Sequence, residues 1–418
     1  MSANPAVSAA VAEAHRHEWA FVLAATVRIT RDIDLAEECV QDAYASALTA
    51  WAKAGIPSRP GAWLTTAARR RALDLLRRRA TAQRALPLLL DDELTPGPDE
   101  LDDDTGTTPI GDDRLRLIFT CCHPTLGQQA QVALTLRLLC GLSTREVASA
   151  FLVTEPTMAA RITRAKKKIT TARIPYRVPP EPELAARVDV VLTVVHLLFA
   201  TGHTAPAGDE LVRRDLVERS LDLARMLRTL LPDNPDVAGL LALILLTDAR
   251  RHTRTDDAGG LLLLAEQDRN LWDRRGIDEG IALVREALGR RPPVRFTLMA
   301  AIAAVHGEAP TYADTDWREI AALYGVLVQI WPSPVVALNR AVAIGFAHGP
   351  AAGLVELDIL TSEPQLAGYG YLPAARAHLL ADQGRVAEAR LAYREALLLT
   401  ENTVERDFLA ERLAQLDT

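Results

Sequence analysis

The sequence predicts an all-α protein built from several small helical domains. Leu, Ala and Arg abound while aromatic residues make up only 5% of the chain, a balance that favours helices over β-sandwiches. A chain of 418 residues is too long for one core. Apolar residues recur at helical spacing in three blocks. We therefore expect two small helical domains, at residues 10–87 and 114–177, joined by an acidic flexible linker at residues 88–113. A helical-repeat domain follows at residues 185–418, and it can divide into 185–290 and 291–418.

The acidic whole-chain charge conceals two basic segments. The formal net charge is −7, yet residues 1–87 carry 12 Lys+Arg against 8 Asp+Glu, and residues 114–177 carry 11 against 2. Residues 178–418 carry 24 against 34 and are acidic. Both basic segments are therefore candidates for binding a polyanion, because a polyanion is attracted by the local charge of a segment and not by the net charge of the whole chain.

An acidic stretch separates the two basic segments. Residues 88–113 hold 10 carboxylates and no base, and Asp91–Asp113 combines them with Pro, Gly and Thr and lacks an apolar helical period. This composition predicts a flexible linker. It is either a solvated tether or a mimic of nucleic acid that occupies a basic groove until a polyanion displaces it.

The first basic segment begins with an amphipathic helix, "DLAEECVQDAYASALTAW", at residues 34–51. Four-residue steps place one set of small and apolar residues on its buried side. That set is Leu35, Cys39, Ala43 and Ala47. The polar side carries Glu37, Glu38, Gln41 and Asp42.

A second helix of this segment, "WLTTAARRRALDLLRRR", holds six arginines between Trp63 and Arg79. Its apolar seam is Leu64, Ala68, Ala72 and Leu75. Asp74 lies four residues from Arg70 and from Arg78 and can pair with either. The other arginines form a solvated face or, because a guanidinium fork suits phosphate, a contact with nucleic acid.

The second basic segment has the pattern of a helix-turn-helix. In "GLSTREVASAFLVTEPTMAARITRAKKKI", Ser143 and Glu146 form a capping box, and Thr154 caps a second helix with Pro156 in its first turn. The buried stripe of that helix is Met158, Ile162, Ala165 and Ile169. A basic outer face on the second helix is typical of the element that enters the major groove, although an ordinary helical hairpin would have the same periods.

These blocks, in this order, resemble a bacterial sigma-70-type RNA polymerase sigma factor of the extracytoplasmic-function group. The resemblance covers about residues 10–175 and depends on "AEECVQDAY", the arginine-rich helix and the helix-turn-helix. It implies binding to core RNA polymerase and to promoter DNA. The acidic helix would bind polymerase, and the basic segments would contact the −10 and −35 elements.

The resemblance assigns the following residues. The polymerase contacts would be Glu37, Glu38, Gln41 and Asp42. The −10 contacts would come from the loop Gly55–Ala62 and the helix after it, namely Arg59, Trp63, Arg69, Arg70, Arg77 and Arg78. Trp63 either stacks on a base or belongs to the core, and the helix start favours the core. The −35 bases would meet Thr157, Arg161 and Arg164, and phosphates would meet Lys166, Lys167 and Lys168. The group commonly has Asn where this chain has Arg70, so an Asn contact does not transfer.

The acidic C-terminal half has the periods of paired helices. "VREAL" at 284–288 returns as "YREAL" at 393–397, and Gly349 and Gly384 each precede a helix. The last unit matches tetratricopeptide spacing at Ala377, Leu380, Gly384, Ala389, Tyr393 and Ala396. Such an extension resembles a subgroup of sigma factors in which the extension takes part in controlling activity. We expect this domain to pack on the two promoter-binding domains and to set whether their DNA-binding surfaces are available, with the acidic linker permitting the rearrangement. The alternative is a free-standing recruitment module. The repeats also suit a protein or peptide partner.

Enzymatic, metal and membrane functions are not indicated. Cys121, Cys122 and His123 lack an apparent fourth ligand, and Gly202 argues against one continuous helix carrying His196 and His203. We expect no cofactor, no metal and no catalysis. We also expect a cytoplasmic protein, since no apolar run approaches a membrane span. The alternative is a conventional helix-turn-helix regulator with a sensing domain, which would lack the acidic polymerase-binding helix.

Overall fold

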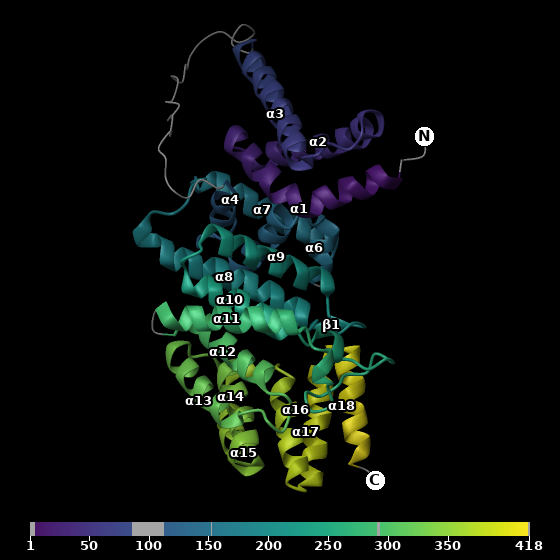
Figure 1. Cartoon of the computed structure of the whole chain (residues 1–418), viewed down its shortest axis with the longest axis vertical. Helices are drawn as coiled ribbons and strands as arrows, with labels where there is room; N and C mark the ends of the chain where they lie inside the picture. Colours follow the sequence, from purple (N-terminus) through teal and green to yellow (C-terminus); the bar gives the residue numbers. More distant parts are fainter. Residues whose placement is uncertain (1–4, 86–112, 152, 291–292, 417–418) are drawn as a thin grey trace. The chain divides into compact units, whose positions relative to one another are not determined.

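The computed structural model of the chain describes residues 5–85, 113–151, 153–290 and 293–416. In these ranges the chain is helical apart from two two-residue strands and the connecting loops, so the predicted all-α class is confirmed. The chain forms two compact units, Met1–Val194 and Val195–Thr418, which are described separately (Figure 1). Nearly all of the predicted linker, residues 88–112, lies outside the described residues.

The first unit contains seven helices and the beginning of an eighth in its described part. They are α1 (Pro5–Thr30), α2 (Ile33–Ala54), α3 (Pro60–Ala85), α4 (Asp113–Cys121), α5 (Gln128–Leu134), α6 (Thr144–Ala150), α7 (Glu155–Thr171) and α8 (Glu181–His203). A π-helical turn, Thr135–Leu139, continues α5.

Helices α1, α2 and α3 pack on one another in the purple and blue part of Figure 1. The predicted seams form this core: Leu35, Cys39 and Ala72 are buried together, and Leu75 packs against them. Helix α3 begins at Pro60, so the loop expected to run to Ala62 ends at Arg59. Proline suits the first helical turn because its ring presets φ and its missing N–H has no intrahelical partner there.

Helix α8 corrects two expectations. It runs without a break from Glu181 through Gly202 to His203. Gly202 is tolerated because it permits a close helix contact: a Cβ there would lie 2.8 Å from Leu216 Cβ and from the Val217 backbone nitrogen. By length and composition α8 could also cross a membrane, contrary to the expectation that no apolar run is long enough. Core helices have the same composition, and its residues Val191 and Leu192 are buried.

The second unit consists of helices and one pair of short strands in its described part. In chain order they are β1 (Ala207–Gly208), α9 (Arg214–Leu230), α10 (Pro235–Asp248), α11 (Arg274–Arg290), α12 (Arg295–Glu308), α13 (Trp317–Ile330), α14 (Pro334–His348), α15 (Pro350–Leu360), α16 (Tyr371–Asp382), α17 (Val386–Leu399), β2 (Glu401–Asn402) and α18 (Thr403–Gln415). Strands β1 and β2 pair in parallel.

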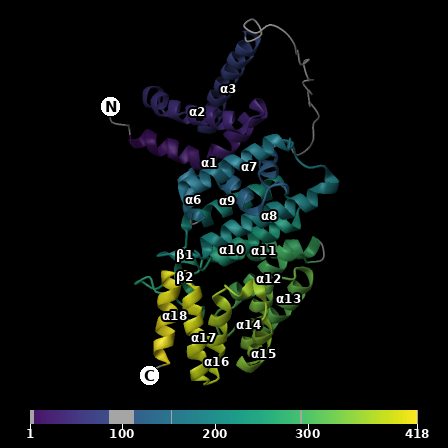
Figure 2. The same ribbon diagram turned by 180° about the vertical axis from the view of Figure 1, so that it is seen from behind.

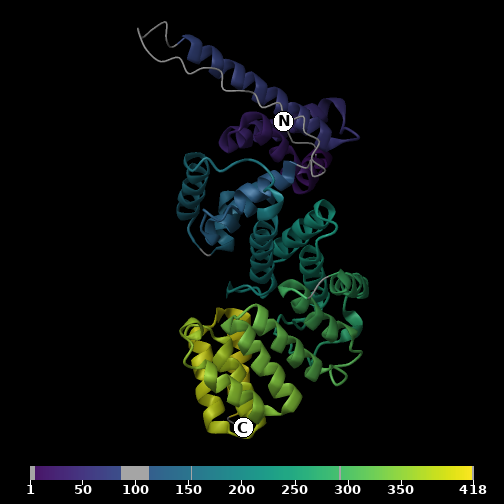
Figure 3. The same ribbon diagram turned by 90° about the vertical axis from the view of Figure 1, so that its left-hand side faces the viewer.

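Successive helices of this unit pack as neighbours. Figures 2 and 3 show the green and yellow helices α13 to α18 as one bundle. The segment "PDNP", residues 232–235, lies where α9 gives way to α10, and Asn234 caps α10 by accepting hydrogen bonds from the backbone of Asp236 and Val237. Gly384 has a φ of 71°, a left-handed value that glycine adopts without strain, and it turns the chain from α16 into α17.

The residues with tetratricopeptide spacing lie in this bundle. Its core includes, among others, Ala377, Leu380, Ala389, Tyr393 and Ala396, all buried, together with Leu354 and Leu357 of α15. Small residues at these positions let neighbouring helices approach closely. Whether the unit is a tetratricopeptide array remains a prediction.

Candidate nucleic-acid interface

The helix-turn-helix forms as its sequence predicts. Ser143 N–H donates to Glu146 Oε2 over 2.7 Å, and Glu146 N–H donates to Ser143 Oγ over 3.2 Å, which completes the capping box that begins α6. Thr154 Oγ1 accepts from the backbone of Thr157 at the start of α7. The predicted stripe of Met158, Ile162, Ala165 and Ile169 is buried. These contacts hold α7 against the unit by one face and leave its other face in solvent.

The outer face of α7 is basic. Thr157, Arg164 and Lys167 are exposed, and Arg161 is half-buried with its guanidinium carbon 5.4 Å from the centre of the Phe151 ring. Lys168 is exposed and its Nζ donates to the Thr125 carbonyl over 2.5 Å. An exposed helix face with these donors can contact phosphates and base edges in a major groove.

Lys166, expected to contact phosphates with Lys167 and Lys168, does not share their exposure in this structure. Only 14% of its side chain is exposed, and its ammonium contacts Asp34 Oδ1 at 2.6 Å and Glu37 Oε2. Burial by itself would lower the pKa of Lys166. The two carboxylates outweigh that effect, so its pKa lies above its usual value.

Glu37 is buried as well, although the helical period places it on the polar side of α2 with Glu38. Its side chain is 6% exposed. The Arg137 guanidinium lies 2.9 Å from its Oε1 as an ion pair, without the alignment of a hydrogen bond. Sequence reasoning missed Asp34 and Arg137, since no local spacing connects residues more than 90 positions apart.

The remaining residues of the polar side of α2 stay accessible. Glu38 and Gln41 are exposed, and Asp42 is partly exposed and accepts a hydrogen bond from Arg71 Nε over 2.7 Å. The helix itself begins where Asp32 accepts from the backbone of Leu35. The accessible acidic surface is therefore narrower than the sequence suggests.

The arginines of α3 divide into two groups. Arg69, Arg70, Arg77, Arg78 and Arg79 are exposed, whereas Arg71 is half-buried. Asp74 does not pair with Arg70 or Arg78 as expected, since its ion-pair contact is with Arg77 at 3.7 Å. Arg71 and Arg79 reach the preceding helix and its cap, at Asp42 and at Asp32. These contacts between separate helices were outside the reach of an i, i+4 argument.

The loop before α3 presents the other residues expected at a −10 element. Arg59 is exposed, and its carbonyl accepts a hydrogen bond from the Trp63 backbone. The indole of Trp63 is half-buried and meets the buried Trp51 edge-on, with ring centres 5.7 Å apart. Trp63 therefore contributes to the core while part of its ring remains accessible.

Segments on either side of residues 86–112 pack together within this unit. Trp19 Nε1 donates to the Leu138 carbonyl over 3.0 Å, and Tyr176 donates to the Ala24 carbonyl over 2.9 Å. Arg28 Nε lies 3.1 Å from Asp113 Oδ2. Together with the contacts of Glu37, these three contacts join helices α1 and α2 to residues 113–177, which contain the helix-turn-helix.

The thiols of the cysteine and histidine cluster are buried. Cys121 and Cys122 are buried, and burial raises the pKa of Cys122 to about 12, so the thiol stays protonated at neutral pH. The described part of the chain contains no group of three His, Cys, Asp or Glu side chains placed to hold a metal ion.

Comparison with known proteins accounts for most of the chain. Residues 16–81 match Sigma-70 region 2, residues 116–169 match Sigma-70 region 4, and residues 187–288 match a family of unknown function, DUF6596. An uncharacterized protein of Rhizobium meliloti (strain 1021) is 40% identical over 394 residues, which cover 94% of this chain and 93% of that protein. No solved structure matches. With both sigma regions in order and a helical extension after them, the chain belongs to the sigma-70 family as a sigma factor of the extracytoplasmic-function type with a C-terminal extension.

Proposed function

We propose that this sigma factor directs core RNA polymerase to promoters whose −35 element is read by α7 and whose −10 element meets the Gly55–Arg59 loop and α3. Promoter recognition in transcription initiation, without catalysis, follows from the two sigma-70 regions. The observation that supports the assignment to α7 is its geometry. A capped helix is packed by one face and carries Thr157, Arg164 and Lys167 on the other.

The −35 contacts divide by chemistry. Thr157, Arg161 and Arg164 lie in the first three turns of α7 and would reach base edges, because the N-terminal part of a recognition helix enters the groove. Lys167 and Lys168 lie further along and would contact phosphates. For the −10 element, the exposed guanidiniums of Arg59, Arg69, Arg70 and Arg78, together with Arg77, would hold the backbone while Trp63 offers part of its ring to an unstacked base.

The polymerase contact is assigned to Glu38, Gln41 and Asp42 on the accessible side of α2. Glu37 and Lys166 contact each other, so their own proposed roles, toward polymerase and toward phosphate, require that α2 and α7 separate. The conformation described here is therefore proposed to be one that opens when polymerase binds.

The second unit is proposed to modulate this activity. It follows the sigma regions in the same chain, and its stacked helices offer surface for a protein or peptide partner. We also propose that the protein acts in the cytoplasm, because its proposed partners, core polymerase and promoter DNA, are found there.

The test is transcription by purified core polymerase with the full chain and with a chain that ends after α8 at residue 203. The full chain should initiate at a cognate promoter, and the shortened chain should differ several-fold in rate while it stays helical by circular dichroism. Equal rates would remove the modulating role. Binding of duplex DNA without any association with core polymerase would instead favour an ordinary helix-turn-helix regulator.

A further inference from the structure

The second unit contains a cavity of about 820 Å³, formed by residues of α8, α10, α12, α14 and α16 and by the chain that follows α10. We call this cavity the polar chamber, because its lining includes His203, Arg250, Arg254, Asn339 and Tyr371. Cavities that hold small organic ligands have volumes of roughly 300–1,000 Å³. The chamber is therefore large enough for such a ligand.

Two guanidiniums line the polar chamber, and within the described residues neither forms an ion pair with a carboxylate. Arg254 is 91% buried (9% exposed), and its NH groups donate to neutral oxygens, the His203 carbonyl and, over 3.0 Å, Thr204 Oγ1. Burial, and then the charges of Arg254 and Arg269, lower the pKa of Arg250 to about 10. Two like charges that line one cavity favour the entry of an anion.

The nearby carboxylates have other partners. Asp248 accepts from Arg251 Nε over 2.8 Å, and Glu405 accepts from the Tyr371 hydroxyl over 2.6 Å. A short 3-10 turn, Arg251–Thr253, separates the two chamber arginines and places Arg251 with Asp248. Within the described residues, Arg251 has a carboxylate partner and lies outside the cavity lining, whereas Arg250 and Arg254, which line it, have none.

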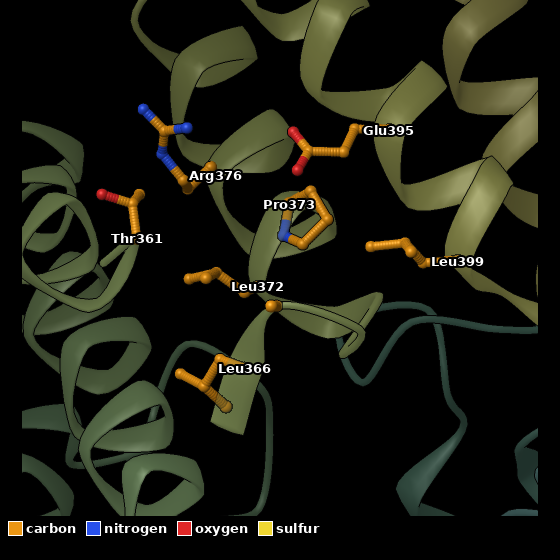
Figure 4. A pocket seen from close by; sticks show the side chains of 8 residues that line it. Thr361, Leu366, Leu372, Pro373, Arg376, Glu395 and Leu399 are labelled. Atoms are coloured by element: carbon orange, nitrogen blue, oxygen red, sulfur yellow. The ribbon is translucent and has the colours of Figure 1, made fainter. Parts of the chain in front are cut away.

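A second cavity, lined by residues of α16 and α17 and by the chain that follows α15, is much smaller, and its arginine is paired with a carboxylate (Figure 4). Its volume is about 70 Å³, and its guanidinium, that of Arg376, pairs with Asp358 at 2.9 Å. Glu395 also lines it. With little room and a compensated charge, this cavity has the character of a gap in packing rather than of a binding site.

His203 lines the polar chamber and has a buried polar atom without a partner in the described part of the chain. The side chain is 8% exposed, it lines the cavity, and its Nδ1 has no hydrogen-bond partner among the described residues. A buried polar nitrogen without a partner costs free energy unless a ligand or water meets it. Because this nitrogen is enclosed by protein, a ligand in the cavity would not reach it in this rotamer, and the guanidiniums of Arg250 and Arg254 are the groups that would hold an anion.

An apolar cavity of about 390 Å³ adjoins the polar chamber. We call it the apolar chamber, since Leu261, Leu263, Phe408 and Leu409 line it. The carboxylates of Glu401 and Glu405 also border it, and Glu405 accepts the hydrogen bond from Tyr371. The two share Pro206, Tyr369, Tyr371 and Ala374. A molecule could thus place a charged head beside Arg250 and Arg254 and an apolar body past Ala374.

We propose that the second unit binds a small organic anion whose carboxylate or phosphate head occupies the polar chamber and whose apolar body occupies the apolar chamber. The guanidiniums of Arg250 and Arg254 would hold the head, since charge-assisted hydrogen bonds from arginine suit both kinds of anion. This inference is independent of the modulating role proposed above, because it concerns binding alone.

The test is calorimetric titration of the full-length protein with four probes: octanoate, octyl phosphate, octanol and inorganic phosphate. Octanoate or octyl phosphate should bind, and the better of the two identifies the preferred head. Octanol, which lacks the charge, and inorganic phosphate, which lacks the body, should bind at least about tenfold more weakly. Absence of binding by both octyl anions, or equal binding of octanol, would overturn the proposal.

Variants place the binding in the chambers. Arg250→Gln should weaken the octyl anion at least about tenfold, whereas Arg285→Gln, at an exposed arginine that pairs with Glu308, should not. Ala374→Leu adds bulk at a residue that lines both chambers, and it should weaken the octyl anions by a similar factor without any change of charge. Thermal unfolding verifies that each variant is folded, and Arg254→Gln replaces Arg250→Gln if the latter is not. Unchanged affinity in both a charge variant and the steric variant would contradict the assignment.

Discussion

Arg137 and Glu37 form an ion pair, 2.9 Å between NH2 and Oε1, in which neither side chain is more than 17% exposed. Lys166 contacts the other oxygen of the same carboxylate. Glu37 of the acidic helix α2 thus neutralises two cations, Arg137 and Lys166, which lie beyond the linker in the part of the unit that contains the helix-turn-helix. A buried carboxylate with two partners is stable only while both portions stay packed.

The first prediction concerns this carboxylate. Glu37→Gln leaves Arg137 and Lys166 without their shared charge, and the free energy of unfolding of the full chain should fall by about 3 kcal/mol or more. Glu38→Gln is the matched control, because Glu38 is exposed one residue away and should change stability by less than about 0.5 kcal/mol. Chemical denaturation measures both. Similar values for the two variants would mean that the carboxylate of Glu37 is not buried in solution.

A second prediction tests the polymerase surface. Glu38→Lys should abolish or strongly weaken co-purification of core polymerase, because it reverses a charge on the accessible side of α2 without breaking an ion pair described here. Glu183→Lys, at an exposed position in the first turn of α8, serves as the control and should retain polymerase. Retention by both variants would place the docking surface elsewhere.

The third prediction separates base reading from phosphate binding on α7. Arg161→Ala should weaken promoter-specific initiation by about 1–3 kcal/mol, with the loss confined to templates that carry one particular base. Lys167→Ala should weaken all templates alike and reduce the slope of log affinity against log salt concentration by about 1. Affinities on a set of −35 variants at several salt concentrations distinguish them. If the two substitutions change the affinities for all −35 variants in the same way, α7 does not lie in the groove in the orientation proposed here.

A fourth prediction concerns acid stability of the second unit. Burial, and then the charges of Arg250 and Arg269, lower the pKa of His306 to about 4. The unfolded chain, where the pKa of histidine is about 6.5, binds the proton more readily, so stability is retained above about pH 6.5 and falls as the pH drops toward 4.

Since the imidazole of His306 is only partly enclosed, the loss between pH 6.5 and 5 should be roughly 1 kcal/mol for this group. Thermal unfolding of His306→Gln should show a shallower decline with acidification than the parent chain. His348→Gln, at an exposed histidine, should leave the decline unchanged. An identical pH profile for all three chains would contradict the assignment of His306.

Local patterns were read correctly from the sequence where the interaction itself is local. The capping box of Ser143 and Glu146, the Thr154 cap and the stripe from Met158 to Ile169 each involve residues three or four positions apart, and a helix brings such residues together regardless of its surroundings. The all-α class could be predicted for the same reason, because the apolar spacing that indicates a helix is also a local pattern. Gly202 was misread because its weak helix propensity was counted, whereas the contact with Val217 that favours it is tertiary.

The sequence by itself determined the helices, their caps, their buried stripes and the sigma family. Only the tertiary structure decided that Glu37 is buried while Glu38 is exposed, that Lys166 packs toward α2 while Lys167 faces solvent, and that Arg250 and Arg254 line one cavity. Helical periodicity specifies which residues share a face of one helix. It contains no information about which other helix covers that face, because such contacts join residues far apart in the chain and depend on how the helices pack.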